Sequence, residues 1–320
     1  MNGKYLIPLL LGAIACFVFA GCDNFEGNQQ IPSYIKVKGF NLVADDNLGL
    51  GFVQDEGFLS NEISDVWVFV TKNGKQQFMG AYTLKDSGTM NIPVLEEGIS
   101  YVELRPGIKY NGMNGTREYY SFYTRCYDTV DLQPGQVVEI PVQNISYNSL
   151  ASISQAYMFE DNYIPFENLP TVSDDYPDYM HLVSGDSVSY GSKCAALYSS
   201  SSSDIYKVLM RDSISCANHN AMILEMDYHS NIDFEVGLYG KMMSAGNEYY
   251  ISCMRILAND NPDYAAGDRR NWKKMYIILG KVWGQLNYNA FKLWLQPVNN
   301  KGLQDGFVHI DNIKIIHFPE

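Results

Sequence analysis

The sequence predicts an all-β protein that consists of two β-sandwich domains behind an N-terminal export signal. Composition is the first indication: the 320 residues include 24 Tyr and 26 Gly, and aromatic, β-branched and turn-forming residues favour strands and turns. Spacing is the second, since short apolar or alternating segments recur with turn residues between them. Length is the third, because a chain of this size suits two domains of ordinary size.

The first residues have the layout of a secretory signal. Lys4 precedes an apolar run that ends at Gly21-Cys22, and this run is shorter than the roughly 20 apolar residues of a membrane-spanning helix. Phe19-Ala20-Gly21-Cys22 resembles the lipobox of bacterial lipoproteins, with Phe where Leu is usual. The resemblance implies that residues 1–21 are a lipoprotein signal peptide and that Cys22 carries lipid. An ordinary secreted protein cleaved nearby and an uncleaved anchor are the alternatives.

A lipid anchor would make a membrane one partner of the protein. Two or more acyl chains hold a protein stably, whereas one holds it only marginally, and the resemblance implies a diacylglycerol and an N-acyl chain such as palmitate. The acidic segment Asp23–Glu26 is similar to signals of surface lipoproteins in the Bacteroidetes. We therefore expect residues 22–30 to be a lipidated tether, with the body at the outer membrane and on the cell surface.

The charge of the chain argues against nucleic acid as a partner. The formal net charge is −13, and loss of the signal removes Lys4 and no acidic residue. Such a body repels the phosphate backbone unless it has a basic patch. The densest basic pairs, Arg269-Arg270 and Lys273-Lys274, are too short to make one, and we interpret them as part of a solvated loop.

The cysteines leave the disulfide state open. Of six cysteines, Cys16 lies in the signal and Cys22 is the expected lipidation site. An oxidising envelope permits disulfides, but four cysteines allow three pairings and the sequence does not choose among them. Buried thiols and one bridge within the C-terminal half both remain open, and the absence of any CxxC unit argues against zinc. The cysteines concerned are Cys126, Cys194, Cys216 and Cys253.

Residues 31–146 are expected to form the first, small β-sandwich. Tyr34–Lys38 alternates as a strand does, and Val66–Val70 is apolar on both faces, which indicates a strand between two layers. Asn73-Gly74 followed by Phe78–Tyr82 is a strong hairpin signal. Further strands and turns are expected at Met90–Leu95, Glu97-Gly98, Tyr101–Leu104, Glu118–Tyr127 and Val137–Val142.

This first body resembles two groups of proteins. The order VWVFVTKNGKQQFMGAYTL…IPVLEEGISYVEL is similar to PEGA-like and transthyretin-like surface modules. The blocks IPSYIKV, SDVWVFV, MGAYTL and DLQPGQVVEI look like an uncharacterised family of Bacteroidetes outer-membrane lipoproteins. That family has no settled activity, so the resemblance implies lineage and location only.

Residues 156–320 are expected to form the second β-sandwich, after the polar connection Tyr147–Gln155. Met222–Tyr228 and Ile232–Leu238 alternate, and the second of these places Ile, Phe, Val and Leu on one face and acids on the other. The opening MFEDNYIPFENL and the closing GFVHIDNIKIIHF resemble carbohydrate-binding modules and galactose-binding-like domains. The resemblance implies that this sandwich is a jelly roll and that a glycan is its ligand.

The same resemblance implies a structural calcium ion. In jelly rolls of this type an acid near the opening FE and the aspartate of the closing strand often hold calcium. Carried over, these positions are Glu160 and Asp311, with Asp161 as a further candidate. Calcium prefers six to eight oxygen ligands, which two acids do not supply. The alternative is that Asp311 only shapes the final strand.

Aromatic side chains are the other candidate ligand contacts. In Phe291–Gln296 the odd positions are apolar, so Trp294 shares the opposite face with Lys292 and Gln296. A solvent-facing Trp there could stack on a sugar ring or anchor a protein partner. Against this, Trp is usually largely buried. The weaker candidates are Trp272, Tyr276 and Trp283.

Three tripeptides look like the acceptor for O-glycosylation in Bacteroidetes envelope proteins. They begin with Asp and continue with Thr129, Ser187 and Ser213 as the modified residues. A chain of this length would contain such a match by chance, so the resemblance implies no more than three candidates.

No catalytic signature is present in the sequence. It contains no GxSxG, HExxH, Walker loop or complete GxGxxG. We therefore expect a non-enzymatic outer-membrane lipoprotein for recognition or scaffolding, with a glycan or an envelope protein as ligand. The alternatives are a glycan-degrading hydrolase with a jelly-roll catalytic domain and a structural subunit of a secretion, adhesion or motility assembly.

Overall fold

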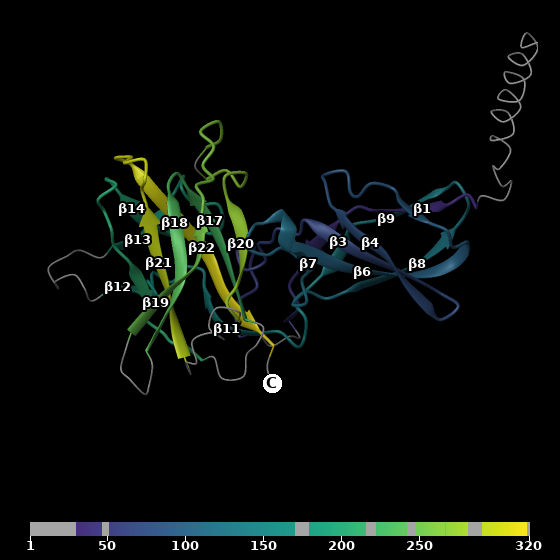
Figure 1. Ribbon diagram of the computed structural model, residues 1–320, viewed down its shortest axis with the longest axis horizontal. Coiled ribbons are helices and arrows are strands. Elements are labelled where there is room, and N and C mark those ends of the chain that lie inside the picture. Colours follow the sequence, from purple (N-terminus) through teal and green to yellow (C-terminus); the bar gives the residue numbers. More distant parts are fainter. Residues whose placement is uncertain are drawn as a thin grey trace, which may run out of the picture.

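The computed structural model describes residues 30–46, 51–169, 179–215, 222–241, 248–265, 267–280 and 290–318. Strands dominate these residues and form two β-sandwich domains that lie side by side (Figure 1). The predicted all-β fold, with two β-sandwiches and a jelly roll as the second, is confirmed. The signal peptide, Cys22, Cys216 and Trp283 lie outside the described residues. No helix among the described residues is long and apolar enough to cross a membrane.

The N-terminal domain packs one five-stranded sheet against two smaller sheets. Its strands are β1 (Ser33–Val37), β2 (Phe40–Leu42), β3 (Asp65–Lys72), β4 (Lys75–Thr83), β5 (Ile92–Val94), β6 (Gly98–Lys109), β7 (Arg117–Tyr119), β8 (Cys126–Leu132), β9 (Val137–Ile140) and β10 (Gln143–Ile145), with a 3-10 turn at Asn114–Thr116. The larger sheet has the order β4-β3-β6-β7, and β8 also pairs with β6. The smaller sheets have the orders β5-β1-β9 and β10-β2.

Strand β3 is covered on one face only. Its valines point into the core, whereas Trp67 and Phe69 lie on the opposite face and are half-buried. The expectation that Val66–Val70 lies between two layers is therefore wrong, because the outer face keeps part of its surface in solvent. The predicted hairpin is confirmed: Asn73 and Gly74 have φ angles of 50° and 73°, as a type I′ turn requires, and they join β3 to β4.

The C-terminal domain consists of two six-stranded sheets packed face to face. Its strands are β11 (Ser152–Tyr157), β12 (Phe166–Asn168), β13 (Met180–Ser184), β14 (Lys193–Ser199), β15 (Val208–Met210), β16 (Ile214–Ser215), β17 (Met222–Ser230), β18 (Asp233–Lys241), β19 (Glu248–Ile256), β20 (Lys273–Ile278), β21 (Ala290–Val298) and β22 (Gly306–His317). One sheet has the order β13-β14-β22-β17-β20 with β11 on β22. The other has the order β12-β15-β21-β18-β19 with β16 on β21.

The alternation of β18 matches its predicted faces. Ile232, Phe234, Val236 and Leu238 are all buried in the core between the two sheets, so the inward face was predicted correctly. Strand β11 already pairs with β22 from Ser152 onward. The second sandwich thus includes residues that the sequence analysis assigned to the connection.

The two domains share part of their hydrophobic core. Ile223, Tyr276 and Ile316 lie on the outer face of the β17-β20-β22 region and belong to the same apolar cluster as the N-terminal core. An isolated parallel bridge also joins Tyr110 to Tyr276. Strand β17 is buried on both faces along its whole length. Its inner face meets its own sandwich, and its outer face meets the N-terminal domain from Ile223 to Asp227 and the loop residues Asp260 and Trp272 at His229.

Candidate functional site

The domain junction contains a buried network of charged side chains, centred on Glu225. The side chain of Glu225 is 0% exposed. Its carboxylate accepts hydrogen bonds from the hydroxyls of Tyr120 at 2.6 Å and Tyr147 at 3.0 Å, both from the N-terminal domain. The ammonium of Lys314 lies 3.0 Å from the same carboxylate. A carboxylate on the outer face of one domain is thus satisfied by the other domain.

Two lysines connect this carboxylate to the neighbouring segments. Lys314 donates to the backbone carbonyl of Phe58 at 2.5 Å and to the Tyr147 hydroxyl. Lys274 donates to Ser60 at 2.8 Å and lies 3.5 Å from Glu225. Each cation therefore bridges the C-terminal sheet to the N-terminal domain.

The two lysines set the charge states of the network. Burial alone would raise the pKa of Glu225, but the Lys314 and Lys274 ammoniums and the Tyr120 hydroxyl outweigh it and hold the pKa at about 2. Burial lowers the pKa of Lys314 to about 8, although Glu225 favours its charged form. The groups are fully engaged with one another, so we assign the network a structural role in fixing the two domains.

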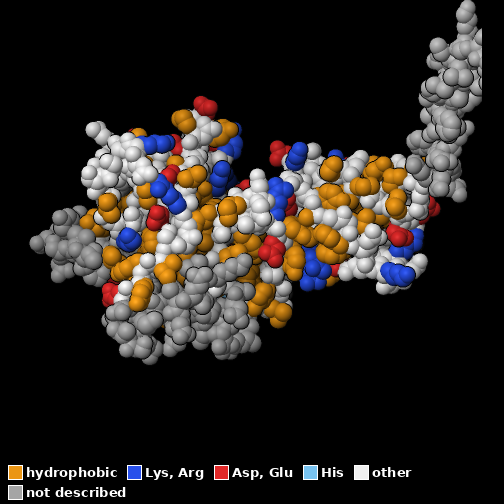
Figure 2. Space-filling model, in the orientation of Figure 1, with side chains coloured by type: hydrophobic (Ala, Val, Ile, Leu, Met, Phe, Trp, Pro, Cys, Tyr) orange, Lys and Arg blue, Asp and Glu red, His pale blue; other side chains and the backbone are white. Residues whose placement is uncertain are grey.

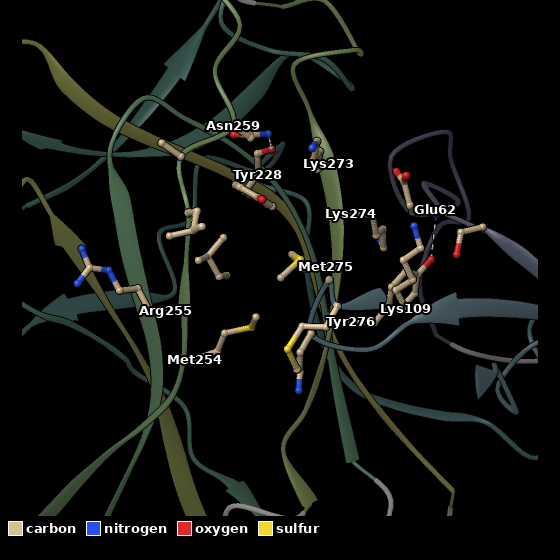
Figure 3. Close-up of a pocket in the computed structure, with 17 residues that line it drawn as sticks. Glu62, Lys109, Tyr228, Met254, Arg255, Asn259, Lys273, Lys274, Met275 and Tyr276 are labelled. Carbon is tan, nitrogen blue, oxygen red and sulfur yellow. Dashed lines mark hydrogen bonds between the residues drawn. The ribbon is translucent and has the colours of Figure 1, made fainter. Parts of the chain in front are cut away.

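An open cleft lies beside this network, between the domains. We call it the junction cleft; its volume is about 530 Å³, within the range of small-molecule sites. Figure 3 shows Arg255 and Met254 on one side of the cavity, Glu62 and Lys109 on the other, and Met275 between them. The N-terminal domain contributes the end of β6 and the segment before β3, and the C-terminal domain contributes β17, β19 and β20.

Some charged side chains that line the junction cleft are paired with other groups in the described part of the protein, and others are not. Arg255 pairs with Asp233 at 2.8 Å, and Lys274 belongs to the buried network. Burial raises the pKa of Glu62, and Lys273 and Lys109 offset part of that shift. Glu62 is the only carboxylate among the described residues that line the cleft.

A second candidate surface is the outer face of the N-terminal sheet β4-β3-β6-β8. We call it the aromatic face. Register pairs Phe78 with Phe69, Phe69 with Glu103, and Glu103 with Tyr127. These residues form a row across four strands, which spans about 14 Å at the usual strand spacing. The six rings of the aromatic face are Trp67, Phe69, Phe78, Tyr101, Tyr119 and Tyr127.

Polar groups are fixed between these rings. The guanidinium of Arg105 lies 4.2 Å from the centre of the Phe69 ring and 5.1 Å from that of Tyr119. Glu103 accepts from Arg105 at 2.7 Å and from Gln76 at 2.8 Å. Burial would raise the pKa of Glu103, but these hydrogen bonds and the neighbouring arginines lower it. The face thus combines ordered ring planes with hydrogen-bonding groups held in place.

The outermost rings of the aromatic face are open to solvent. Tyr127 is 69% exposed, Tyr101 64% and Phe78 51%. Trp67 packs directly over Gly107 of β6, where a Cβ would come within 2.3 Å of the indole ring. Figure 2 shows hydrophobic side chains gathered on the N-terminal domain with charged groups among them. The sequence analysis did not identify this face, because β3 is apolar on both sides and was expected to be covered on both.

The structure places the predicted aromatic ligand contacts mostly inside the protein. Trp294 lies on the face opposite Leu293 and Leu295, as its parity predicted. The expectation that it faces solvent is wrong: it is 2% exposed and packs with Leu169, Leu209 and Tyr239. Trp272 and Tyr276 are buried as well, and Trp283 lies outside the described residues.

The predicted calcium ligands have separate protein partners. Glu160 accepts hydrogen bonds from the backbone N–H of Ser192 at 2.8 Å and of Lys193 at 3.2 Å, and Asp161 accepts from a nearby backbone N–H. Asp311 is buried on β22, and burial raises its pKa well above the usual range. Across the described residues no group of three or more His, Cys, Asp or Glu is placed to hold a metal. Calcium at Glu160 and Asp311 stays a prediction.

The described cysteines are free thiols. Cys126 and Cys194 are buried and Cys253 is half-buried, and burial raises the pKa of the Cys126 thiol to about 11. The three candidate acceptors for O-glycosylation differ in accessibility. Thr129 and Ser213 are exposed, whereas Ser187 is half-buried, and their modification stays a prediction.

In the comparisons with known proteins, this chain is similar only to solved structures of β-domains. No family model and no curated protein matches the chain. A family 30 carbohydrate-binding module of a cellulosomal cellulase from Clostridium thermocellum is 16% identical, with a TM-score of 0.36, over 50% of this chain and 96% of that one.

Two further solved structures are similar at the same level. The module TmCBM61, solved in complex with β-1,4-galactotriose, is 13% identical with a TM-score of 0.31, over 52% of this chain and 100% of that one. The K3 adhesin domain of Lys-gingipain from Porphyromonas gingivalis is 9% identical with a TM-score of 0.31, over 51% of this chain and 99% of that one.

Proposed function

We propose that this chain is a non-enzymatic lipoprotein of the bacterial outer membrane that binds a glycan through the aromatic face. The observation that carries the proposal is the row of Phe78, Phe69, Glu103 and Tyr127 across four strands, with exposed rings at both ends. Monomeric proteins rarely keep contiguous apolar surface in solvent unless it has a function.

The chemistry of this face suits a sugar chain. The C–H groups on one side of a sugar ring pack against an aromatic plane, and its hydroxyls need hydrogen-bonding partners at the edge of that plane. Tyr101 and Tyr127 supply open planes, while Arg105, Glu103 and Gln76 supply donors and acceptors already held in position. Preorganised contacts reduce the entropic cost of binding.

Binding without cleavage is the version of this function that we favour. A glycosidase of the usual type needs two carboxyl groups on either side of the scissile bond. The described residues of the junction cleft include one, Glu62. The carboxylate of Glu103 on the aromatic face is occupied by Arg105 and Gln76, which leaves it without the free proton of a general acid.

Location rests on the amino-terminal motif. We propose that Cys22 is lipidated and anchors the body to the outer membrane, with residues 22–30 as the tether. Cells fed labelled palmitate should incorporate it into the protein, and Cys22→Ala should abolish both the label and retention in the membrane fraction. Unchanged processing and retention of Cys22→Ala would contradict the anchor.

The binding proposal is tested with the full chain in detergent on an array of plant, host and bacterial polysaccharides. Positives are then measured by affinity electrophoresis with Tyr101→Ala/Tyr127→Ala. Loss of the two most exposed rings of the aromatic face should weaken binding at least about tenfold, since aromatic side chains at binding hot spots contribute more than 1 kcal/mol each. The matched control is Tyr198→Ala, an exposed tyrosine of the C-terminal domain.

Two results would contradict the proposal. One is an array on which no polysaccharide is retained. The other is equal binding by the double variant and the control variant, which would place any glycan site away from the aromatic face.

A further inference from the structure

The junction cleft has two lysine cations that share a single carboxylate of its lining. Lys109 stands at the end of β6 and Lys273 at the start of β20, so they face the cleft from different domains. Glu62 is the carboxylate that interacts with both. Among the described residues no carboxylate oxygen lies within 4.0 Å of either ammonium. One carboxylate against two ammoniums leaves a local positive charge in a chain whose formal net charge is −13.

The remaining lining of the junction cleft is amphipathic. Met254, Met275 and Tyr228 supply apolar and aromatic surface, and Asn111 and Asn259 add polar groups to the lining. Figure 3 shows Tyr228 and Met275 in the middle of the cavity, with Lys273 above them. A ligand that fits this lining has a partly apolar body, hydrogen-bonding groups and one negative charge.

We propose that the junction cleft is a second binding site, which takes the carboxylate-bearing sugar unit of an acidic oligosaccharide. The carboxylate binds between Lys109 and Lys273, and the ring of the sugar lies on Met275 and Tyr228. The sugar part of this inference rests on the proposed function, but the site is separate from the exposed rings of the aromatic face.

Charge and size separate this ligand from other anions. A polyanion such as nucleic acid would meet the field of an acidic body beyond the two lysines. A bare inorganic anion would use the lysines but leave a cavity of about 530 Å³ largely unfilled. A sugar acid carries a single charge on a body that can cover the methionines, and charge-assisted hydrogen bonds to lysine give it orientation.

The test uses the full chain in detergent and isothermal titration calorimetry. The probes are galacturonate, mannuronate and glucuronate-bearing trimers, each measured beside its methyl ester, and inorganic phosphate alone. We expect at least one acid trimer to bind at least tenfold more tightly than its ester and than phosphate, with an affinity that falls as salt is raised. In Lys109→Gln/Lys273→Gln that affinity should fall at least tenfold.

Control variants keep the readout specific. Lys75→Gln/Lys301→Gln changes two exposed lysines elsewhere and should bind like the wild type, and circular dichroism confirms that each variant is folded. The inference is overturned if every acid trimer binds no better than its ester, if phosphate binds as tightly as the best trimer, or if Lys109→Gln/Lys273→Gln binds that trimer as the wild type does.

A third pair of variants separates the two proposals. Tyr101→Ala/Tyr127→Ala should keep the acid-trimer affinity, because those rings lie away from the cleft. If acid trimers bind with the expected dependence on Lys109 and Lys273 while no polysaccharide binds the aromatic face, the proposed function is refuted and the inference about the junction cleft is supported. If polysaccharides bind the aromatic face but acid trimers do not bind the cleft, the inference about the junction cleft is overturned and the proposed function stands.

Discussion

Replacement of Lys314 by methionine is expected to destabilise the whole protein. Its ammonium lies 3.0 Å from the Glu225 carboxylate and donates to the Phe58 carbonyl at 2.5 Å, with no exposed surface. Methionine fills a similar volume but leaves the carboxylate with Lys274, 3.5 Å away, and two tyrosine hydroxyls. Removal of one partner from a buried ion pair costs about 3–5 kcal/mol, because the remaining charge stays buried.

The expected loss is a large part of the stability of an ordinary domain, roughly 5–15 kcal/mol. For domains of 150–250 residues each kcal/mol of destabilisation lowers the midpoint temperature of thermal unfolding by roughly 2–4 °C, so Lys314→Met should lower that temperature by roughly 6–20 °C. Glu225→Gln/Lys314→Met removes both charges and keeps the amide as a hydrogen-bond partner for the tyrosines. The double variant should therefore lose at least about 1 kcal/mol less than the sum of the single variants.

Urea unfolding of the body from Gln30 onward, followed by tryptophan fluorescence and circular dichroism, measures the differences in free energy, and thermal unfolding followed by circular dichroism measures the shift in midpoint temperature. The control is Lys301→Met, an exposed lysine in a turn, which should change the free energy of unfolding by less than about 0.5 kcal/mol. Because the network joins the domains, Lys314→Met is also expected to split one transition into two. Similar stability of Lys314→Met and Lys301→Met, or additive effects in the double variant, would refute the assigned role.

Three further predictions follow from buried groups. The pKa of Glu225 is about 2 in the folded protein, below its ordinary value of 4.5. Its contribution to stability is therefore complete above pH 4.5 and is lost as the pH falls from 4.5 towards 2. In Glu225→Gln the urea midpoint should depend less on pH over that range than in the wild type, and an unchanged pH dependence would contradict this. Gly107→Ala puts a Cβ 2.3 Å from the Trp67 ring and should cost about 1–3 kcal/mol, measured in the same urea assay, where a neutral effect would show that the indole moves freely. Cys194 is fully buried and burial raises its pKa, so iodoacetamide should label it only after urea is added; rapid labelling of native protein, seen by peptide mass, would contradict the packing.

The local pattern of the sequence was sufficient for the strands and some of their faces. Ile232–Leu238 alternates cleanly, and its apolar side is the buried side. Asn73-Gly74 fixed a type I′ hairpin, because only residues that tolerate positive φ fit it. Both features are local, because the alternation of a strand and the φ angles of a tight turn depend only on residues within a few positions of one another.

The same reasoning failed for faces that a distant segment covers or leaves open. By alternation Glu225 and Asp227 resemble the solvated side of β17, yet both are buried because the N-terminal domain packs on that sheet. Trp294 has polar neighbours in sequence but lies under Leu169 and Tyr239. The rings of the aromatic face show the reverse case, since apolar residues on both sides of β3 suggested a covering layer that their outer side lacks.

The sequence by itself determined the all-β class, the number of sandwiches and the inward side of isolated strands. It did so because alternation with period two and turn residues act within a few positions. The tertiary structure alone decided which outer faces are covered, and therefore where charges are buried and where rings and lysines stay open for a ligand. Whether an outer face is covered depends on contacts between residues more than a hundred positions apart, such as Tyr120 and Glu225. The local periodicity of the sequence contains no information about such contacts.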